Sequence, residues 1–224
     1  MRRWCSGVFL LTAAIFLPMF ASAQDFPRAE VFGGYSYLHV DTQGVSGSSL
    51  TNQCNIAFGG ACPVTFQIHP GFNGWNVAPQ ANLNRWFGVK AQIAAQYGNI
   101  ITVKTTSALP IPVISIPGQH IYDLLFGPVA SHRTEKYNAF VHGLIGVQHV
   151  GISGNIAVGG IGGISAATSE TDFAFALGGG LDLKASKHFA IRVAQFDYEL
   201  VNTSGKHQND FRYSGGIVFG FGGR

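Results

Sequence analysis

The segment Asp172–Leu183 reads Asp-Phe-Ala-Phe-Ala-Leu-Gly-Gly-Gly-Leu-Asp-Leu, and its alternation decides the fold. One parity holds Phe173, Phe175, Leu177, Leu181 and Leu183, whereas the other holds Ala174, Ala176, Gly178, Gly180 and Asp182. Successive residues of a β-strand point to opposite faces of the sheet. The segment therefore predicts a strand with one apolar face and one face of small or polar side chains.

The last segment, Asp210–Phe221, repeats this alternation with a more aromatic face. Its apolar parity runs from Phe211 to Phe221, and Arg212 and Ser214 lie on the opposite parity. A soluble sheet covers its apolar face with a second layer, but no amphipathic helix or second sheet is evident in the sequence. Lipid then becomes the expected cover, and a polar face turned inward predicts a transmembrane β-barrel.

The whole chain divides into segments of this kind and predicts an all-β, eight-stranded antiparallel transmembrane β-barrel. The expected strands are Ala29–His39, Asn73–Asn84, Phe87–Gly98, His120–Ala130, Tyr137–Val150, Asp172–Leu183, Phe189–Thr203 and Asp210–Phe221. Their connections alternate between long and short, the fifth being the long loop Gly151–Thr171, and the facing of the first, fifth and seventh strands stays open. Periplasmic turns of such barrels are short and extracellular loops are longer, so both termini are expected in the periplasm.

Residues 1–23 have the pattern of a secretory signal peptide. An arginine pair precedes an apolar run from Val8 to Phe20, and Ala21-Ser22-Ala23 is a typical cleavage site. We therefore expect a single mature domain at residues 24–224. The formal charge is 14 − 11 = +3 for the whole chain and 12 − 11 = +1 for the mature domain, because both arginines of the signal peptide are removed. A charge this small indicates no nucleic acid partner. Charged residues form only 11% of the chain, too few to coat a water-facing surface.

Cys54 and Cys62 are the two cysteines that remain after such cleavage, and they lie eight positions apart in a polar, glycine-containing stretch. An exported protein encounters an oxidising compartment, so this spacing predicts a disulfide that closes a small external loop. The alternative is a pair of free thiols.

Several short motifs resemble the small OmpA-like outer-membrane β-barrels. They are Gly33-Gly34-Tyr35-Ser36-Tyr37, Phe126-Gly127-Pro128, Leu177-Gly178-Gly179-Gly180-Leu181-Asp182, Ile191-Arg192 and Asp197-Tyr198. The resemblance implies insertion into outer-membrane lipid by the barrel-assembly machinery. It covers the barrel domain only, and we expect no peptidoglycan-binding module and hence no anchoring role of that kind.

Polar and charged residues on the small-residue parity predict a network inside the barrel. Its expected members are Lys90, Gln92, Asp123, Asp182 and Arg192. Asp182 and Arg192 flank one short turn, so hairpin pairing should bring them together as a salt bridge near the periplasmic end. Asp197 has the wrong parity to join Arg192 and implies either a bulge or a position at the outer interface.

No motif indicates a cofactor or metal site. The histidines are scattered, and Gly159-Gly160-Ile161-Gly162-Gly163 lacks the Lys-Ser/Thr that follows a phosphate-binding loop, so we expect a flexible external loop there. His149 and Ser153 are the one pair that a barrel-type lipid-modifying hydrolase could use.

The sequence thus favours a non-enzymatic outer-membrane barrel that supports the envelope and displays loops for extracellular contacts. Two alternatives stay open at this point. One is the lipid-modifying hydrolase, and the other is a secreted soluble β-barrel that binds a ligand.

Overall fold

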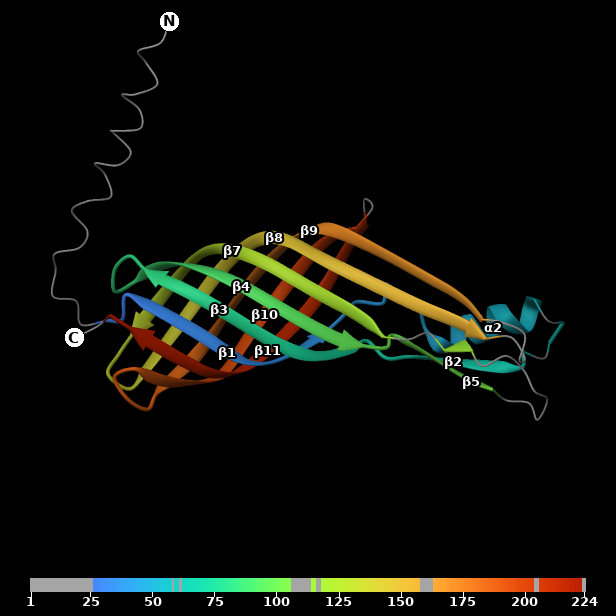
Figure 1. The fold of residues 1–224 in the computed structure, drawn as a ribbon, viewed down its shortest axis with the longest axis horizontal. Coiled ribbons are helices and arrows are strands. Elements are labelled where there is room, and N and C mark those ends of the chain that lie inside the picture. Colours follow the sequence, from blue (N-terminus) through green and yellow to red (C-terminus); the bar gives the residue numbers. More distant parts are fainter. Residues whose placement is uncertain are drawn as a thin grey trace, which may run out of the picture.

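Eight antiparallel strands close into a barrel in the computed structural model of this chain, as Figure 1 shows. The structure describes residues 26–57, 59–60, 62–105, 114–115, 118–157, 163–203 and 206–222. The barrel strands are β1 (Ala29–His39), β3 (Gly71–Asn82), β4 (Phe87–Gly98), β7 (Gln119–Arg133), β8 (Tyr137–Ala157), β9 (Gly163–Lys184), β10 (Phe189–Thr203) and β11 (Lys206–Phe221). The signal peptide expected at residues 1–23 lies outside the described residues.

Each strand pairs with its sequence neighbours, and the first strand pairs with the last. β1 runs antiparallel to β11 from the pair Ala29 and Phe221 to the pair His39 and Phe211, without a register shift. This ladder completes the ring, so the described barrel has no free edge at its seam.

The outer wall of the barrel is apolar. Side chains at mid-strand positions of this wall are large, hydrophobic and exposed; they include Val89, Ile93, Leu124, Phe126, Val141, Ile145, Phe173, Leu177 and Ile217. Exposed aromatic side chains lie toward both ends of the strands. Those toward the long connections include Tyr35, Tyr37, Trp75, Tyr97, Tyr122, Tyr198 and Tyr213, and those toward the short turns include Trp86, Phe87, Tyr137, Phe219 and Phe221. Two aromatic girdles around an apolar band are the pattern of a barrel in a bilayer.

The structure also settles the facing of the strands that the sequence left open. In β1, Phe32 and Ser36 point inward while Tyr35 points outward; in β8, His142 is buried and Val141 is exposed. In β10, Arg192 is buried and Ile191 is exposed. All three strands therefore follow the apolar-out, polar-in rule of the others.

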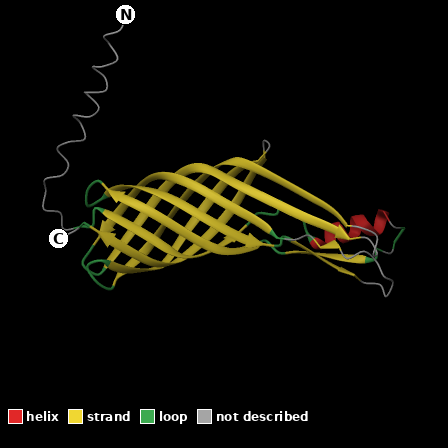
Figure 2. Cartoon of the chain, viewed as in Figure 1, coloured by secondary structure: helices red, strands yellow, loops and turns green. Residues whose placement is uncertain are grey.

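The two ends of the barrel differ (Figure 2). One end carries the three short turns at residues 83–86, 134–136 and 185–188, together with the start of β1 and the end of β11; we call it the turn end. The opposite loop end carries helix α2 (Gly47–Ala57), the two-stranded sheet β2 (Val64–Ile68) and β5 (Ile101–Thr105), and the short β6 (Ile114–Ser115), which pairs with β8. Within the described residues, no helix is long and apolar enough to cross a membrane.

The prediction of a long loop at Gly151–Thr171 is wrong for most of that segment. The ladder between β8 and β9 continues from Gly151 and Ser169 to Ala157 and Gly163. Backbone pairing along this ladder lets the two strands satisfy each other's hydrogen-bonding groups beyond the barrel rim. Of the expected glycine loop at 159–163, residues 159–162 lie outside the described residues and Gly163 begins β9.

Helix α2 is a second departure, because the sequence indicated only a polar connection there. The Ser49 backbone N–H donates to Ser46 Oγ at 3.1 Å, which is an N-cap contact. None of the residues of α2 is buried, so it lacks the apolar stripe by which helices are detected in sequence.

Substitutions at two neighbouring glycines of β1 test the pairing of β1 with β11. A Cβ at Gly34 would lie 2.2 Å from the Gly215 carbonyl oxygen of β11, whereas a Cβ at Gly33 would meet nothing within 4 Å. We predict that Gly34→Ala lowers the free energy of unfolding by about 1–3 kcal/mol, the usual cost of overpacking. Gly33→Ala, the matched control, should leave it within about 0.5 kcal/mol. Urea unfolding in lipid vesicles measures both, and equal effects would contradict the described register.

Candidate functional site

Polar and charged side chains fill the interior of the barrel, and they form its candidate site. All five residues expected there are at most 4% exposed: Lys90, Gln92, Asp123, Asp182 and Arg192. An eight-stranded barrel is just wide enough for side chains to fill, so each buried charge needs a partner inside.

Near the turn end, Arg192 forms a bidentate salt bridge with Asp182. Arg192 Nε donates to Asp182 Oδ1 at 2.7 Å, and Nη2 donates to Oδ2 at 3.1 Å. The guanidinium carbon also lies 4.3 Å from the ring centres of Phe32 and Phe140. Two hydrogen bonds and two aromatic faces therefore hold this cation on the inner wall of the barrel.

A second cluster lies beside it and joins Lys90, His142 and Asp197. Lys90 Nζ lies 3.3 Å from His142 Nδ1, and His142 Nε2 lies 3.0 Å from Asp197 Oδ1. An ammonium group only donates, so Nδ1 accepts and the Nε2–H donates to the carboxylate. Gln195 links this cluster to the first, because its Oε1 accepts from Lys90 at 3.2 Å and from Arg192 at 2.7 Å.

Asp197 reaches the lumen through a β-bulge. The ladders of β10 shift by one residue after Arg192, against β9 and against β11. Without that extra residue the side chain of Asp197 would face lipid; with it, Asp197 is 2% exposed. Of the two explanations that the sequence left open, the bulge is the one that the structure has.

A third cluster toward the loop end surrounds Arg212. Its guanidinium contacts Asp123 and also lies 2.7–2.9 Å from both carboxylate oxygens of Glu199. The sequence placed Arg212 and Asp123 on inward parities but did not identify Glu199, whose parity is set by the same bulge.

Interacting side chains lie at both ends of the lumen. At the turn end, Arg133 Nη2 lies 2.5 Å from Glu30 Oε2, which also accepts from Gln80 and Asn82. At the loop end, the interior ends in an apolar cluster of Leu38, Val40, Phe72 and Ile121. Buried side chains therefore lie along the described interior from the turn end to the loop end.

The arrangement offers little for covalent chemistry. The charges of the three clusters are engaged with one another, and no group of three or more His, Cys, Asp and Glu within the described residues could hold a metal ion. His149 is a lipid-side residue of β8 whose Nδ1 lies 2.7 Å from Thr171 Oγ1. Ser153 follows four residues later on the same strand, which places it about 13 Å away along the chain. The structure does not bring this pair together.

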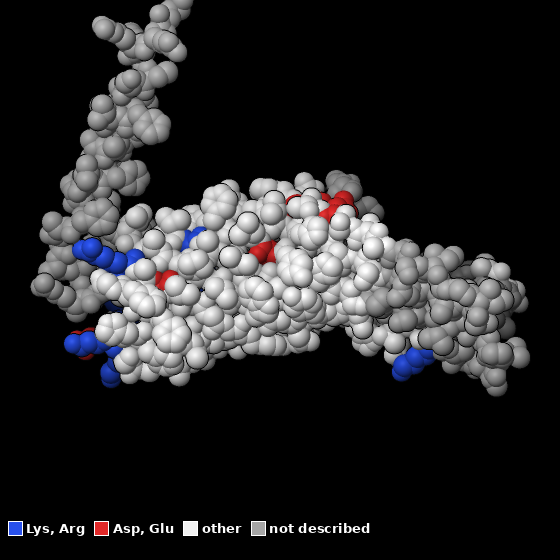
Figure 3. All heavy atoms as spheres, viewed as in Figure 1, with Lys and Arg blue, Asp and Glu red and all other residues white. Residues whose placement is uncertain are grey.

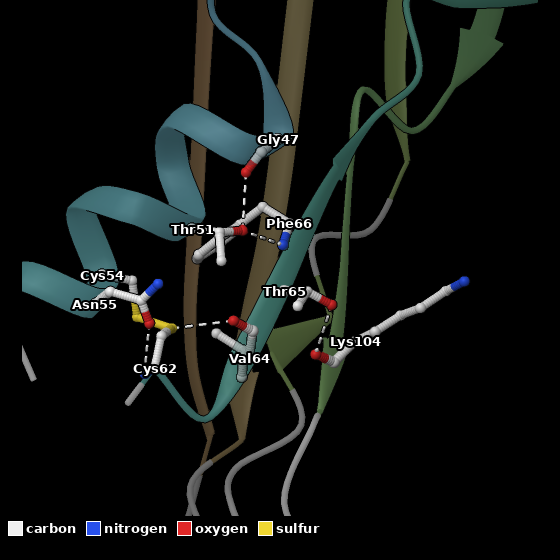
Figure 4. Close-up of a disulfide and its surroundings, with 9 residues drawn as sticks. All are labelled: Gly47, Thr51, Cys54, Asn55, Cys62, Val64, Thr65, Phe66 and Lys104. Carbon is white, nitrogen blue, oxygen red and sulfur yellow. Dashed lines mark hydrogen bonds between the residues drawn. A yellow bond between two sulfur atoms is a disulfide. The ribbon is translucent and has the colours of Figure 1, made fainter. Parts of the chain in front are cut away.

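The loop-end module, which consists of α2, β2 and β5, is braced by the predicted disulfide (Figure 4). Cys54 of α2 is bonded to Cys62, with their Cα atoms 5.4 Å apart. Thr51 Oγ1 donates to the Gly47 carbonyl at 2.8 Å and accepts from the Phe66 backbone N–H at 3.2 Å. Covalent and polar links thus tie the helix to the small sheet.

Comparison with known proteins agrees with this geometry. A family model described as the outer membrane protein β-barrel domain matches residues 8–224. The chain belongs to this family. Its barrel therefore spans the outer membrane, with the apolar wall against lipid. The comparison with curated protein sequences gave no match.

Solved structures share the fold. Ail, the attachment invasion locus protein of Yersinia pestis, in complex with the heparin analogue sucrose octasulfate, is 19% identical, with a TM-score of 0.53 over 85% of this chain and 97% of that chain. Neisserial surface protein A is 8% identical, with a TM-score of 0.54 over 86% and 97%. Identities this low show the fold alone.

The pair of Asp182 and Arg192 gives a prediction for stability. Arg192→Ala leaves the Asp182 carboxylate buried with one amide donor, Asn138 at 3.3 Å, and should cost about 3–5 kcal/mol. The double change to alanine at both positions should cost less than this single change, because it removes the stranded charge. Urea titration in vesicles measures both, and strictly additive losses would argue against a coupled pair.

The disulfide gives a second prediction. Reduction should leave the unfolding midpoint of the barrel unchanged, because the bond closes only an external excursion, while proteolysis within residues 47–62 becomes faster. Alkylation of denatured, non-reduced protein followed by mass measurement checks the bond itself. Two labelled cysteines would disprove it.

Proposed function

We propose that this chain is a non-enzymatic outer-membrane scaffold that supports the envelope and displays the loop-end module to the exterior. The observation that carries this proposal is the contrast between the two parts of the molecule. The lumen holds buried, mutually paired charges, whereas the module is exposed and braced by a disulfide.

The proposed orientation places the short turns in the periplasm and the module outside the cell. It is supported by the turn lengths, because periplasmic turns of such barrels are short. Residues 1–23 would be removed on export, and residues 24–224 would be delivered as one domain to the barrel-assembly machinery. The alternating, aromatic β11 is the strand that this machinery would recognise.

A lipid-modifying hydrolase is the less supported alternative. It needs a nucleophile, a base and an orienting group within hydrogen-bond reach of one another. His149 has Thr171 as its hydrogen-bond partner and stands apart from Ser153. A secreted soluble barrel does not fit a chain of this family with an apolar outer wall.

Two exposed lysines test the orientation. Lys104 lies in β5 of the module, and Lys187 lies in the turn between β9 and β10. A membrane-impermeant amine reagent applied to intact cells should modify Lys104, whereas Lys187 should react only after the outer membrane is permeabilised. Peptide mass mapping gives the two extents. Labelling of Lys187 but not Lys104 in intact cells would indicate the opposite orientation, with the short turns outside the cell.

The proposed roles in envelope support and in external contacts require a separate experiment. In cells that lack the protein, full-length protein and a variant with residues 41–70 replaced by a short turn should both restore resistance to detergent. Only the full-length protein should restore attachment of the cells to external surfaces. Resistance that requires His149 and Ser153, tested by alanine substitution, would instead favour the enzyme.

A further inference from the structure

A groove on the outside of the barrel lies at the turn end, across β4, β7 and β8. Its lining residues are Trp86, Phe87, Ala130, Ser131, His132, Ala139, Phe140 and Val141. Its volume is about 640 Å³, within the range of about 300–1,000 Å³ in which proteins bind small molecules. It opens on the apolar wall, where Trp86, Phe87 and Val141 are exposed.

Small residues between large ones make this groove. Ala130 of β7 pairs with Phe87 of β4 and with Val141 of β8, while Ala139 of β8 pairs with His132. The two alanines are half-buried. The larger side chains beside them are exposed, and these are Trp86, Phe87, His132 and Val141. The alanines thus form a floor about one side chain deep, and the neighbours form its walls, which is a shape that suits a hydrocarbon chain.

The rim of the groove is aromatic and polar. The His132 ring lies between Trp86, with ring centres 5.5 Å apart, and Tyr137, at 6.4 Å. The guanidinium carbon of Arg85 lies 5.7 Å from the centre of the Trp86 ring. Aromatic rings of this kind sit at the level of lipid head groups.

Basic side chains outnumber acidic ones around the rim and the adjoining turn at residues 134–136, although that turn by itself, with Glu135 and Lys136, is neutral. Lys136 is exposed there, and Lys184 Nζ donates to the Thr134 carbonyl at 2.6 Å. Glu135 is the acidic residue of the same turn, while Glu30 is engaged by the inward-facing Arg133. Figure 3 shows Lys and Arg side chains gathered at this end of the molecule. An apolar groove beneath a cationic rim is complementary to a chain that ends in an anionic group.

We propose that this groove binds one phospholipid, with an acyl chain on the floor of Ala130 and Ala139 and the phosphate at the rim near Arg85 and Lys136. The leaflet that supplies the lipid rests on the proposed function: with the short turns in the periplasm, it is the inner leaflet of the outer membrane. The lipid would then fix the depth of the barrel in the bilayer at this side.

The test uses native mass spectrometry of the purified full-length protein in detergent, titrated with phosphatidylglycerol or with phosphatidylcholine of the same acyl chains. Ala139→Phe fills the floor and should reduce retention of phosphatidylglycerol about tenfold. Ala81→Phe places the same side chain on the exposed wall of β3, outside the groove, and should leave retention unchanged. A heat-dependent shift in gel mobility shows that each variant is folded.

A second variant tests the head-group contacts without replacing a residue that lines the groove. Arg85→Gln combined with Lys136→Gln should abolish the preference for phosphatidylglycerol over phosphatidylcholine. Equal retention by the wild type and Ala139→Phe would overturn the site, and so would a wild type with no preference between the two lipids. Binding of a second copy of the chain that Ala139→Phe prevents would assign the groove to self-association instead. These results are obtained in detergent, so they stand apart from lysine labelling in cells, which tests the orientation.

Discussion

Closure of the backbone ladder is the constraint on which this structure depends. No water reaches the bilayer core to satisfy free N–H and C=O groups, so a sheet that crosses it must have no edge. The pairing of β1 with β11 meets this requirement, and it runs without a shift along the whole of β1. The close approach of the two backbones at the seam requires glycine on both sides, at Gly34 and Gly216. Eight strands then fix the diameter, and the diameter fixes what the lumen can hold.

Inside that narrow lumen, charges are stable only where they meet partners. The three clusters solve this with cations that contact more than one acceptor: Arg192 and Lys90 share Gln195, and Arg212 holds two carboxylates. The bulge in β10 matters here, because it turns Asp197 inward to His142. One inserted residue therefore decides which side chains of β10 face the lipid and which face the polar interior. The paired charges also link strands to one another from inside the barrel.

Strand parity made most of the fold and part of the interior predictable from the sequence. The pairing of Asp182 with Arg192 was predictable because both flank one short turn, so register alone brings them together. The partners of Arg212 come from strands distant in sequence, and no local pattern encodes which acidic residues it meets. Helix α2 escaped prediction because it buries no face, and the extension of β8 and β9 escaped it because glycine and serine weaken the alternation signal. The lipid groove was also hidden, since it arises from alanines of neighbouring strands.

Single-channel recording in planar bilayers tests the central claim, that paired side chains seal the lumen, most directly. Wild-type protein inserted in either direction should give no steady open-channel current, because interacting side chains lie at both ends and in the middle of this narrow barrel. Removing charges from both ends of the packing, by Arg192→Ala and Arg212→Ala together, should open brief current steps in protein that still folds. A large, steady and weakly selective conductance from the wild type would contradict the sealed interior.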